Sequence, residues 1–156
     1  MKTELKTTER EVQMASLSPI MEEVLAAGGS VELTVTGNSM KPMLFHRKSR
    51  VRLQPPRELQ VGDLPLYRRD NGHFVLHRVI GMEHGTYICC GDNQWHPERD
   101  IRQDQILAVV SDFAPNRRWR SVDGLRYRMY WHIWIWIRPV RRLVFGGLRR
   151  IRRWLH

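Results

Sequence analysis

Residues 31–44 read VELTVTGNSMKPML and decide how the middle of the chain folds. Apolar and polar residues alternate from Val31 to Thr36, which is the two-residue period of a strand with one buried face. Gly37 and Asn38 then break the alternation, because both residue types favour turns. The sequence therefore predicts that Ser39 lies in a turn just past the end of a strand.

The same kind of pattern continues through the body of the chain. Asn71-Gly72 separates two apolar runs and predicts a hairpin, and the apolar spacing from Met14 to Ala27 predicts an amphipathic helix. We expect a mainly β fold, with a helical segment at 1–30 and a coiled, mostly antiparallel β domain at 31–114. The further β-rich runs are Arg50 to Leu53, Leu64 to Tyr67, Phe74 to Ile80, Thr86 to Cys90 and Gln105 to Val110.

Positive charge is concentrated at the C-terminal end. The net charge is +10, and residues 117–156 contain 12 Arg, one Asp and five of the six Trp, so the first 116 residues are close to neutral. This change of composition near Ala114 to Asn116 predicts a boundary. We expect a basic, Trp-rich helical tail at 115–156.

Ser39 and His77 are the candidate catalytic pair. A serine hydroxyl becomes a useful nucleophile only when a neighbouring base removes its proton, and an imidazole can do so near neutral pH. A carboxylate that orients the base completes such a site. Asp92 and Asp100 follow His77 and are candidates for that role, although a turn residue and a surface charge are equally ordinary interpretations of the two.

These residues lie in motifs that resemble the signal peptidase I superfamily. The resemblance covers about half of the chain, from Val31 to Val110, and consists of SMKPML at 39–44, GD at 62–63, HRVI at 77–80 and GDN at 91–93, in the family's order. The bacterial signal peptidases and the self-cleaving repressors of this superfamily use a lysine base, whereas the archaeal and endoplasmic-reticulum branch uses histidine. Here the position is His77, and Lys41 and Lys48 lie too close to Ser39 in sequence to occupy it.

The resemblance implies a role for each matching residue. Ser39 is the expected nucleophile, His77 the base, and Asp92 the aspartate of the GDN motif. A second family acid follows several residues later, where the chain offers Glu98 and Asp100, and Asp100 is the preferred interpretation.

The remaining expected site residues surround Ser39. The bacterial enzymes have a hydroxyl residue two positions before the nucleophile, whereas this chain has Gly37, so the Ser39 N–H group, helped by Asn38, is the expected oxyanion donor. A substrate is expected to bind as an extended strand beside residues 31–36. Val35, Thr36 and Met40 would line that groove.

The tail suggests a membrane surface as a partner. The run MYWHIWIWI at 129–137 is far shorter than the ~20 residues that span a bilayer. Aromatic residues and arginines on an amphipathic helix suit the interface of an anionic membrane. A helix packed on the body and a nucleic-acid site remain alternatives, the second the less favoured. The expected membrane contacts are Trp131, Trp134, Trp136, Arg141 and Arg142.

Together these features predict a serine endopeptidase that cuts signal- or leader-like peptides at a membrane surface. The polar N-terminus shows no export signal, so we expect peripheral attachment on the cytoplasmic face. A peptidase of the same fold acting on a soluble partner, or a catalytically idle peptide-binding module, are the alternatives. No cofactor or metal is expected, because Cys89 and Cys90 lack the second cysteine pair of a zinc site.

Overall fold

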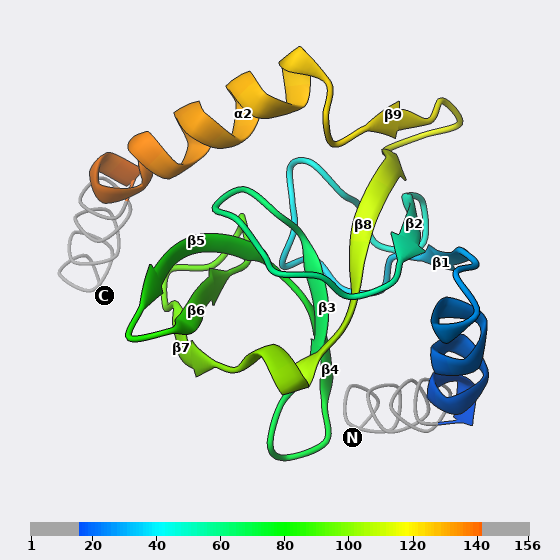
Figure 1. Cartoon of the computed structure of the whole chain (residues 1–156). Coiled ribbons are helices and arrows are strands. Elements are labelled where there is room, and N and C mark those ends of the chain that lie inside the picture. The colour runs from blue at the N-terminus through cyan, green and yellow to red at the C-terminus, as the bar shows by residue number, and fades with distance from the viewer. Residues whose placement is uncertain (1–15, 142–156) are drawn as a thin grey trace, which may run out of the picture.

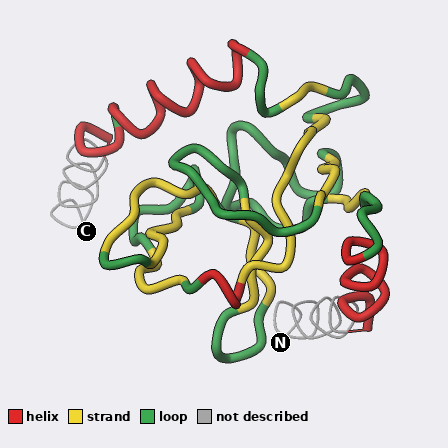
Figure 2. Tube along the Cα trace, in the orientation of Figure 1, coloured by secondary structure: helices red, strands yellow, loops and turns green. Residues whose placement is uncertain are grey.

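The chain folds into two antiparallel β-sheets flanked by helices (Figures 1 and 2). The computed structural model describes residues 16–141. A larger sheet has the strand order β1-β2-β8-β3-β4, with β9 also paired to β8, and a smaller sheet has the order β5-β6-β7. The mainly β prediction is confirmed. The strands are β1 (Val31–Thr34), β2 (Arg50–Gln54), β3 (Pro65–Arg68), β4 (Phe74–Leu76), β5 (Arg78–Glu83), β6 (Thr86–Cys90), β7 (Glu98–Ile101), β8 (Ile106–Ala114) and β9 (Arg120–Ser121).

Most of the predicted runs form strands, but one of them divides between the two sheets. The run Phe74 to Ile80 becomes β4 in the larger sheet and β5 in the smaller one, with His77 between them. The predicted hairpin joins β3 to β4, and Gly72 takes the left-handed backbone that its turn requires, with φ 86°. The sequence did not predict β7, β9 or the short 3₁₀ helix η1 (Gln103–Gln105).

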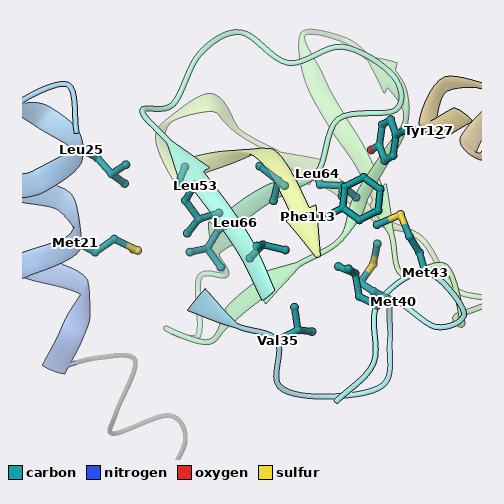
Figure 3. Packing of buried hydrophobic residues seen from close by; sticks show 14 residues of the cluster. Met21, Leu25, Val35, Met40, Met43, Leu53, Leu64, Leu66, Phe113 and Tyr127 are labelled. Atoms are coloured by element: carbon teal, nitrogen blue, oxygen red, sulfur yellow. The ribbon is translucent and has the colours of Figure 1, made fainter. Parts of the chain in front are cut away.

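The N-terminal helix is described over residues 16–26 and covers one side of the main core. Its buried side chains are Met21 and Leu25, which are 4% and 2% exposed. Figure 3 shows both pointing toward Leu53 and Leu66 of the larger sheet. The amphipathic spacing therefore predicted the buried face correctly, while the residues before 16 lie outside the described part.

The chain after β8 returns to the body. After β9 it forms α2 (Leu125–Trp136), and Tyr127 of α2 is 6% exposed and belongs to the main core, where its ring lies 5.5 Å from that of Phe113. The described part of the predicted tail thus contributes to the core of the β domain. No helix within residues 16–141 has the length and apolar character needed to cross a bilayer.

Candidate active site

Ser39 lies in a loop that is closed at its base. The Val35 N–H donates to Ser49 O at 2.9 Å, and the Arg47 N–H donates to Val35 O at 2.8 Å, so the chain enters and leaves the loop side by side. Gly37 has φ 102°, and its N–H donates to His46 Nδ1 at 2.9 Å. The strand-then-turn pattern of the sequence thus gives a loop of fixed shape that presents Ser39 half-buried.

The GDN motif holds this loop from the other side. The Asn93 N–H donates to Ser39 O at 2.7 Å, and Asn93 Nδ2 donates to Asn38 O at 3.3 Å. A Cβ atom on Gly91 would lie 2.7 Å from Ser39 O, so only glycine allows this close approach. Two motifs that are far apart in sequence therefore meet at the candidate nucleophile.

His77 is buried where the chain passes from one sheet to the other. Its side chain is 3% exposed, and Nδ1 lies 3.1 Å from Glu98 Oε1 and 3.2 Å from the Tyr67 hydroxyl oxygen. Since Nδ1 faces these groups, Nε2 is the nitrogen left to act on a serine hydroxyl. A base held in one tautomer by a carboxylate has the arrangement that serine hydrolases need.

Glu98 is fixed by Arg69 as well as by His77. Arg69 Nε donates to Oε2 at 2.7 Å and Arg69 Nη2 to Oε1 at 2.6 Å. Burial opposes ionisation of Glu98, but the hydrogen bonds from Arg69 and His77 outweigh it and lower its pKa to about 2. Glu98 is therefore a carboxylate at every pH at which the protein would work.

Ser39 and His77 line the same cleft. Its volume is about 160 Å³, and its walls include Val35 and Thr36 after β1 and all three residues of β4. Strands β1 and β4 are the two edges of the larger sheet, so the curl of that sheet brings both edges to one cleft. A larger cavity of about 670 Å³ lies between Pro42 and α2, but it contains neither Ser39 nor His77.

The structure corrects both preferred acids. Asp92 lies on the far side of the chain from His77, paired with Arg78, and Asp100 is exposed with φ 59°. Regular alternation would place Asp100 on the same face as Glu98, but β7 has two residues opposite one of β6 at this point, a β-bulge that turns Asp100 away. Glu98, the alternative second acid, is the carboxylate beside His77.

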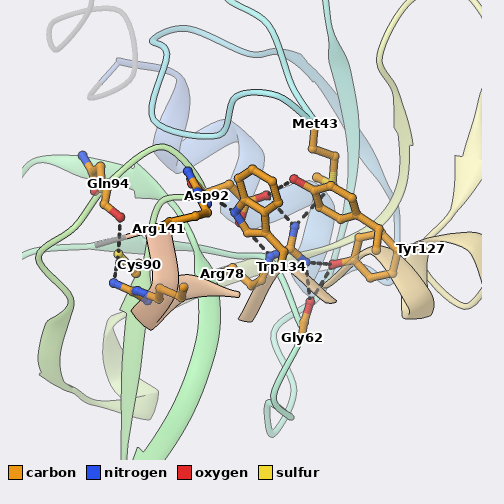
Figure 4. Close-up of polar contacts among 11 residues, drawn as sticks. Met43, Gly62, Arg78, Cys90, Asp92, Gln94, Tyr127, Trp134 and Arg141 are labelled. Atoms are coloured by element: carbon orange, nitrogen blue, oxygen red, sulfur yellow. Dashed lines mark hydrogen bonds and ion pairs between the residues drawn. The ribbon is translucent and has the colours of Figure 1, made fainter. Parts of the chain in front are cut away.

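The Asp92 carboxylate instead lies at the centre of a buried cluster of hydrogen-bonded side chains (Figure 4). Arg78 Nε and Nη2 donate to its two carboxylate oxygens at 2.8 Å each, and the Tyr130 hydroxyl donates to Oδ2 at 3.0 Å. Arg78 Nη1 also donates to Tyr127 Oη at 2.9 Å, and the Tyr127 hydroxyl donates to Gly62 O at 2.5 Å. We call Arg78, Asp92, Tyr127 and Tyr130 the Arg78 cluster.

The Arg78 cluster also explains the GD motif at 62–63. The Gly62 N–H donates to Val79 O and the Val79 N–H donates to Asp63 O, both at 2.9 Å. Gly62 has φ 101°, and a Cβ atom there would collide with the Trp131 ring. Arg78 of the HRVI motif thus contacts one residue from each of the other three motifs, namely Met43, Gly62 and Asp92.

Of the residues expected to contact a membrane, some contact the body of the protein and one is exposed. Trp134 Nε1 donates to Asp92 O at 3.0 Å, Arg141 Nη1 donates to the same oxygen at 3.2 Å, and Trp131 packs against Gly62. These three side chains therefore contact the body. Trp136 is 78% exposed, and the expectation for Arg142 lies outside the described residues.

Other nucleophiles and bases near the site are occupied. Cys89 and Cys90 are buried free thiols, and burial first, then the charge of Glu98, raises the pKa of Cys89 to about 12. The Lys41 ammonium group lies over the Phe45 ring, 5.9 Å from its centre. His77 is the candidate base that lines the same cleft as Ser39.

Tyr67 and Arg69 are functional candidates that sequence reasoning missed. Burial first, then the charge of Glu98, raises the pKa of the Tyr67 hydroxyl, so it stays protonated beside Glu98 and His77. The two residues stand at i and i+2 at the end of β3, and the predicted hairpin faces them toward β4 and His77. The i, i+2 spacing of Tyr67 and Arg69 was therefore the feature of the sequence from which both residues could have been predicted to face His77.

No protein-family model matches the chain, and neither does any curated protein. Within the described residues, no cluster of three or more His, Cys, Asp or Glu side chains could hold a metal ion. The assignment of the site therefore depends on its geometry.

Proposed function

We propose that the protein is a serine endopeptidase in which Ser39 is the nucleophile, His77 the general base and Glu98 the carboxylate that orients the base. The observation that carries the proposal is the shared cleft of Ser39 and His77, with His77 Nδ1 held 3.1 Å from Glu98 Oε1. Tyr67 and Arg69 are positioning residues in this proposal, because each contacts Glu98 or His77.

The reaction begins when Ser39 Oγ attacks the carbonyl carbon of a peptide bond. His77 Nε2 takes the hydroxyl proton as the C–O bond forms, and the ionised Glu98 stabilises the imidazolium. The N–H of Ser39 and the Asn38 side chain are the proposed donors to the oxyanion. The tetrahedral intermediate collapses, the C–N bond breaks, and His77 gives its proton to the leaving amine.

Hydrolysis of the acyl-enzyme reverses these roles. His77 removes a proton from water as the water attacks the ester carbonyl, and the same proton returns to Ser39 Oγ when the C–O bond to the enzyme breaks. The products are a carboxylic acid and the free enzyme. His77 is thus the base of the first step in each half and the acid of the second.

The cleft favours an extended substrate. Backbone groups at Thr36, just past β1, and along β4 lie at edges of the larger sheet, where a peptide can add as a further strand. The small volume beside Ser39 favours small side chains next to the cut bond. Signal- or leader-like segments meet this requirement, as the family resemblance implies, whereas an idle peptide-binding module would not acylate.

Labelling with a serine-directed fluorophosphonate probe tests the proposal. The wild-type protein should be labelled at one site, and Ser39→Ala should lose the label without a change of thermal midpoint, because a half-buried hydroxyl contributes little to the core. Ser111→Ala is a matched serine control and should keep the label. A wild-type protein that is not labelled, or an undiminished label in Ser39→Ala, would contradict the proposal.

A further inference from the structure

Helix α2 has two apolar faces, and the body of the protein covers only one of them. The covered face contains Tyr127, Tyr130, Trp131 and Trp134, all of which contact the core or the Arg78 cluster. The helix runs along the outside of the β body (Figure 1). A helix that is apolar all round is normally buried all round, so the second face requires a separate explanation.

The uncovered face is a continuous stripe of large apolar side chains. Their spacings are four, four, three and four residues, and at 100° per residue they fall within about 80° of one another. This stripe lies roughly opposite the docked aromatic face. Its members, with their exposed fractions, are Leu125 (73%), Met129 (55%), Ile133 (54%) and Trp136 (78%) of α2, and Val140 (55%), which lies four residues past the end of α2.

Arginines lie beside the stripe on α2 and in the segment that precedes the helix. Arg126 and Arg128 are exposed and stand on either side of it around the helix, and Arg117, Arg118 and Arg120 are exposed in the segment that leads to α2. Asp123 is the single acidic residue between positions 117 and 141. The surface around the apolar stripe is therefore cationic.

We propose that the α2 stripe is a membrane-docking surface that lies in the interface of an anionic bilayer. Apolar side chains on one face with arginines beside them are the features that hold a helix in the plane of such an interface. Trp131, Trp134 and Arg141 are not part of this docking surface, because their side chains contact the body. It is independent of the catalytic assignment.

The N-terminal helix provides an internal comparison for this proposal. It also exposes apolar side chains at helical spacing, namely Leu17 (48%), Ile20 (62%) and Val24 (38%). Among residues 16–26, the described part of this helix, the exposed charges are Glu22 and Glu23, which an anionic surface repels. Both helices thus expose apolar side chains. In the described residues, only the apolar stripe of α2 has positively charged neighbours that an anionic lipid surface would attract.

The docked face of α2 connects this surface to the candidate site. Trp134 and Arg141 donate to Asp92 O, and the next residue, Asn93, donates to Ser39 O. Lipid bound to one face of α2 would therefore hold the loop of Ser39 close to the membrane. Peptides that lie at or emerge from the bilayer surface would be the accessible substrates if the proposed function holds.

Vesicle flotation of the full-length chain tests the docking surface. The probes are vesicles of phosphatidylcholine and phosphatidylglycerol in equal parts, and vesicles of phosphatidylcholine alone. Wild-type protein should float with the mixed vesicles and much less with the neutral ones, and high salt should weaken binding. Leu125→Gln/Met129→Gln/Trp136→Gln should lower partitioning by about tenfold or more, since its three apolar contacts with lipid are lost.

Matched variants separate the proposal from its rivals. Leu17→Gln/Ile20→Gln removes exposed apolar area from the N-terminal helix and should float like wild type, whereas Arg126→Gln/Arg128→Gln should lose affinity for the anionic vesicles only. Circular dichroism and thermal midpoints check that every variant is folded, without reference to activity.

Three results would overturn the proposal: wild-type protein that does not float, an α2 triple variant that floats like wild type, or an N-terminal variant that loses binding equally. A wild-type dimer that the α2 triple variant abolishes, in the absence of flotation, would show that a second copy covers the stripe instead.

Discussion

His77 and Arg78 are neighbours in sequence, yet they serve two regions with opposite properties. Arg78 and Asp92 form an ion pair whose side chains are 0% and 2% exposed, and the Asp92 carboxylate also accepts from Tyr130. His77 and Glu98 form a pair in which Glu98 is 22% exposed and His77 is one of the residues that line the cleft.

The difference lies in which atoms are still available for chemistry. Both oxygens of Asp92 are bound by Arg78, so this carboxylate can hold the fold together but can do little else. Glu98 transmits its charge to a base that borders the cleft. Asp92 is thus a buried, fully paired structural acid, whereas Glu98, which contacts a histidine that lines the cleft, is the proposed functional one.

Removal of the base should have the largest effect on activity. His77→Ala should lower turnover on a peptide substrate by about 10⁴-fold or more, because Ser39 then has no proton acceptor. His84→Asn, an exposed turn histidine, should stay near wild type. Lys41→Met should also stay near wild type, and a loss in that variant comparable to that of His77→Ala would point to a lysine base instead.

The next largest difference in turnover should be between variants of the two candidate acids of β7, Glu98 and Asp100. Glu98→Gln should lower turnover by about 10³- to 10⁴-fold while the protein remains folded, because the glutamine amide has the same shape as the carboxylate but does not stabilise the imidazolium. Asp100→Asn should leave turnover near wild type, since Asp100 is exposed beyond the bulge. The opposite order of the two effects would restore Asp100 as the catalytic acid.

The sequence predicted the parts of this site that depend on local pattern. The alternation of residues 31–36 and the turn at Gly37 placed Ser39 past a strand, and the run around His77 was correctly given as β structure. The preference for Asp100 over Glu98 could not be decided from local pattern, because the bulge in β7 that separates the two residues is visible only once β6 is paired with it. Two other features also depend on long-range packing and were not predicted. The β4–β5 run divides between two sheets, and one face of α2 packs on the body.

The Arg78 cluster should affect stability more than any exposed ion pair does. Asp92→Ala should lower the free energy of unfolding by about 3–5 kcal/mol, because it leaves a buried guanidinium without its counter-charge. Glu83→Gln breaks the exposed pair with Arg99, whose side chains are 50% and 57% exposed, and should cost less than about 1 kcal/mol. Urea unfolding measures both, and similar small costs would show that Asp92 is not needed for the fold.

The pH dependence of stability should distinguish Glu98 from the other carboxylates by a smaller effect. Its pKa is lowered from 4.5 to about 2 in the folded protein, since Arg69 and His77 outweigh the effect of burial. A group whose pKa falls on folding stabilises the folded state above its unfolded pKa, and that contribution is lost as pH drops from about 4.5 toward 2. The free energy of unfolding of wild type should therefore exceed that of Glu98→Gln by about 1–3 kcal/mol above pH 5, and this gap should shrink as pH drops from about 4.5 toward 2.

Urea unfolding of the two proteins at a series of pH values measures the gap, and Glu83→Gln provides the control with a carboxylate that is half exposed. A gap that stays constant down to pH 2 would mean that Glu98 is not held as a carboxylate by Arg69 and His77, and would remove the electrostatic support for His77 as the base.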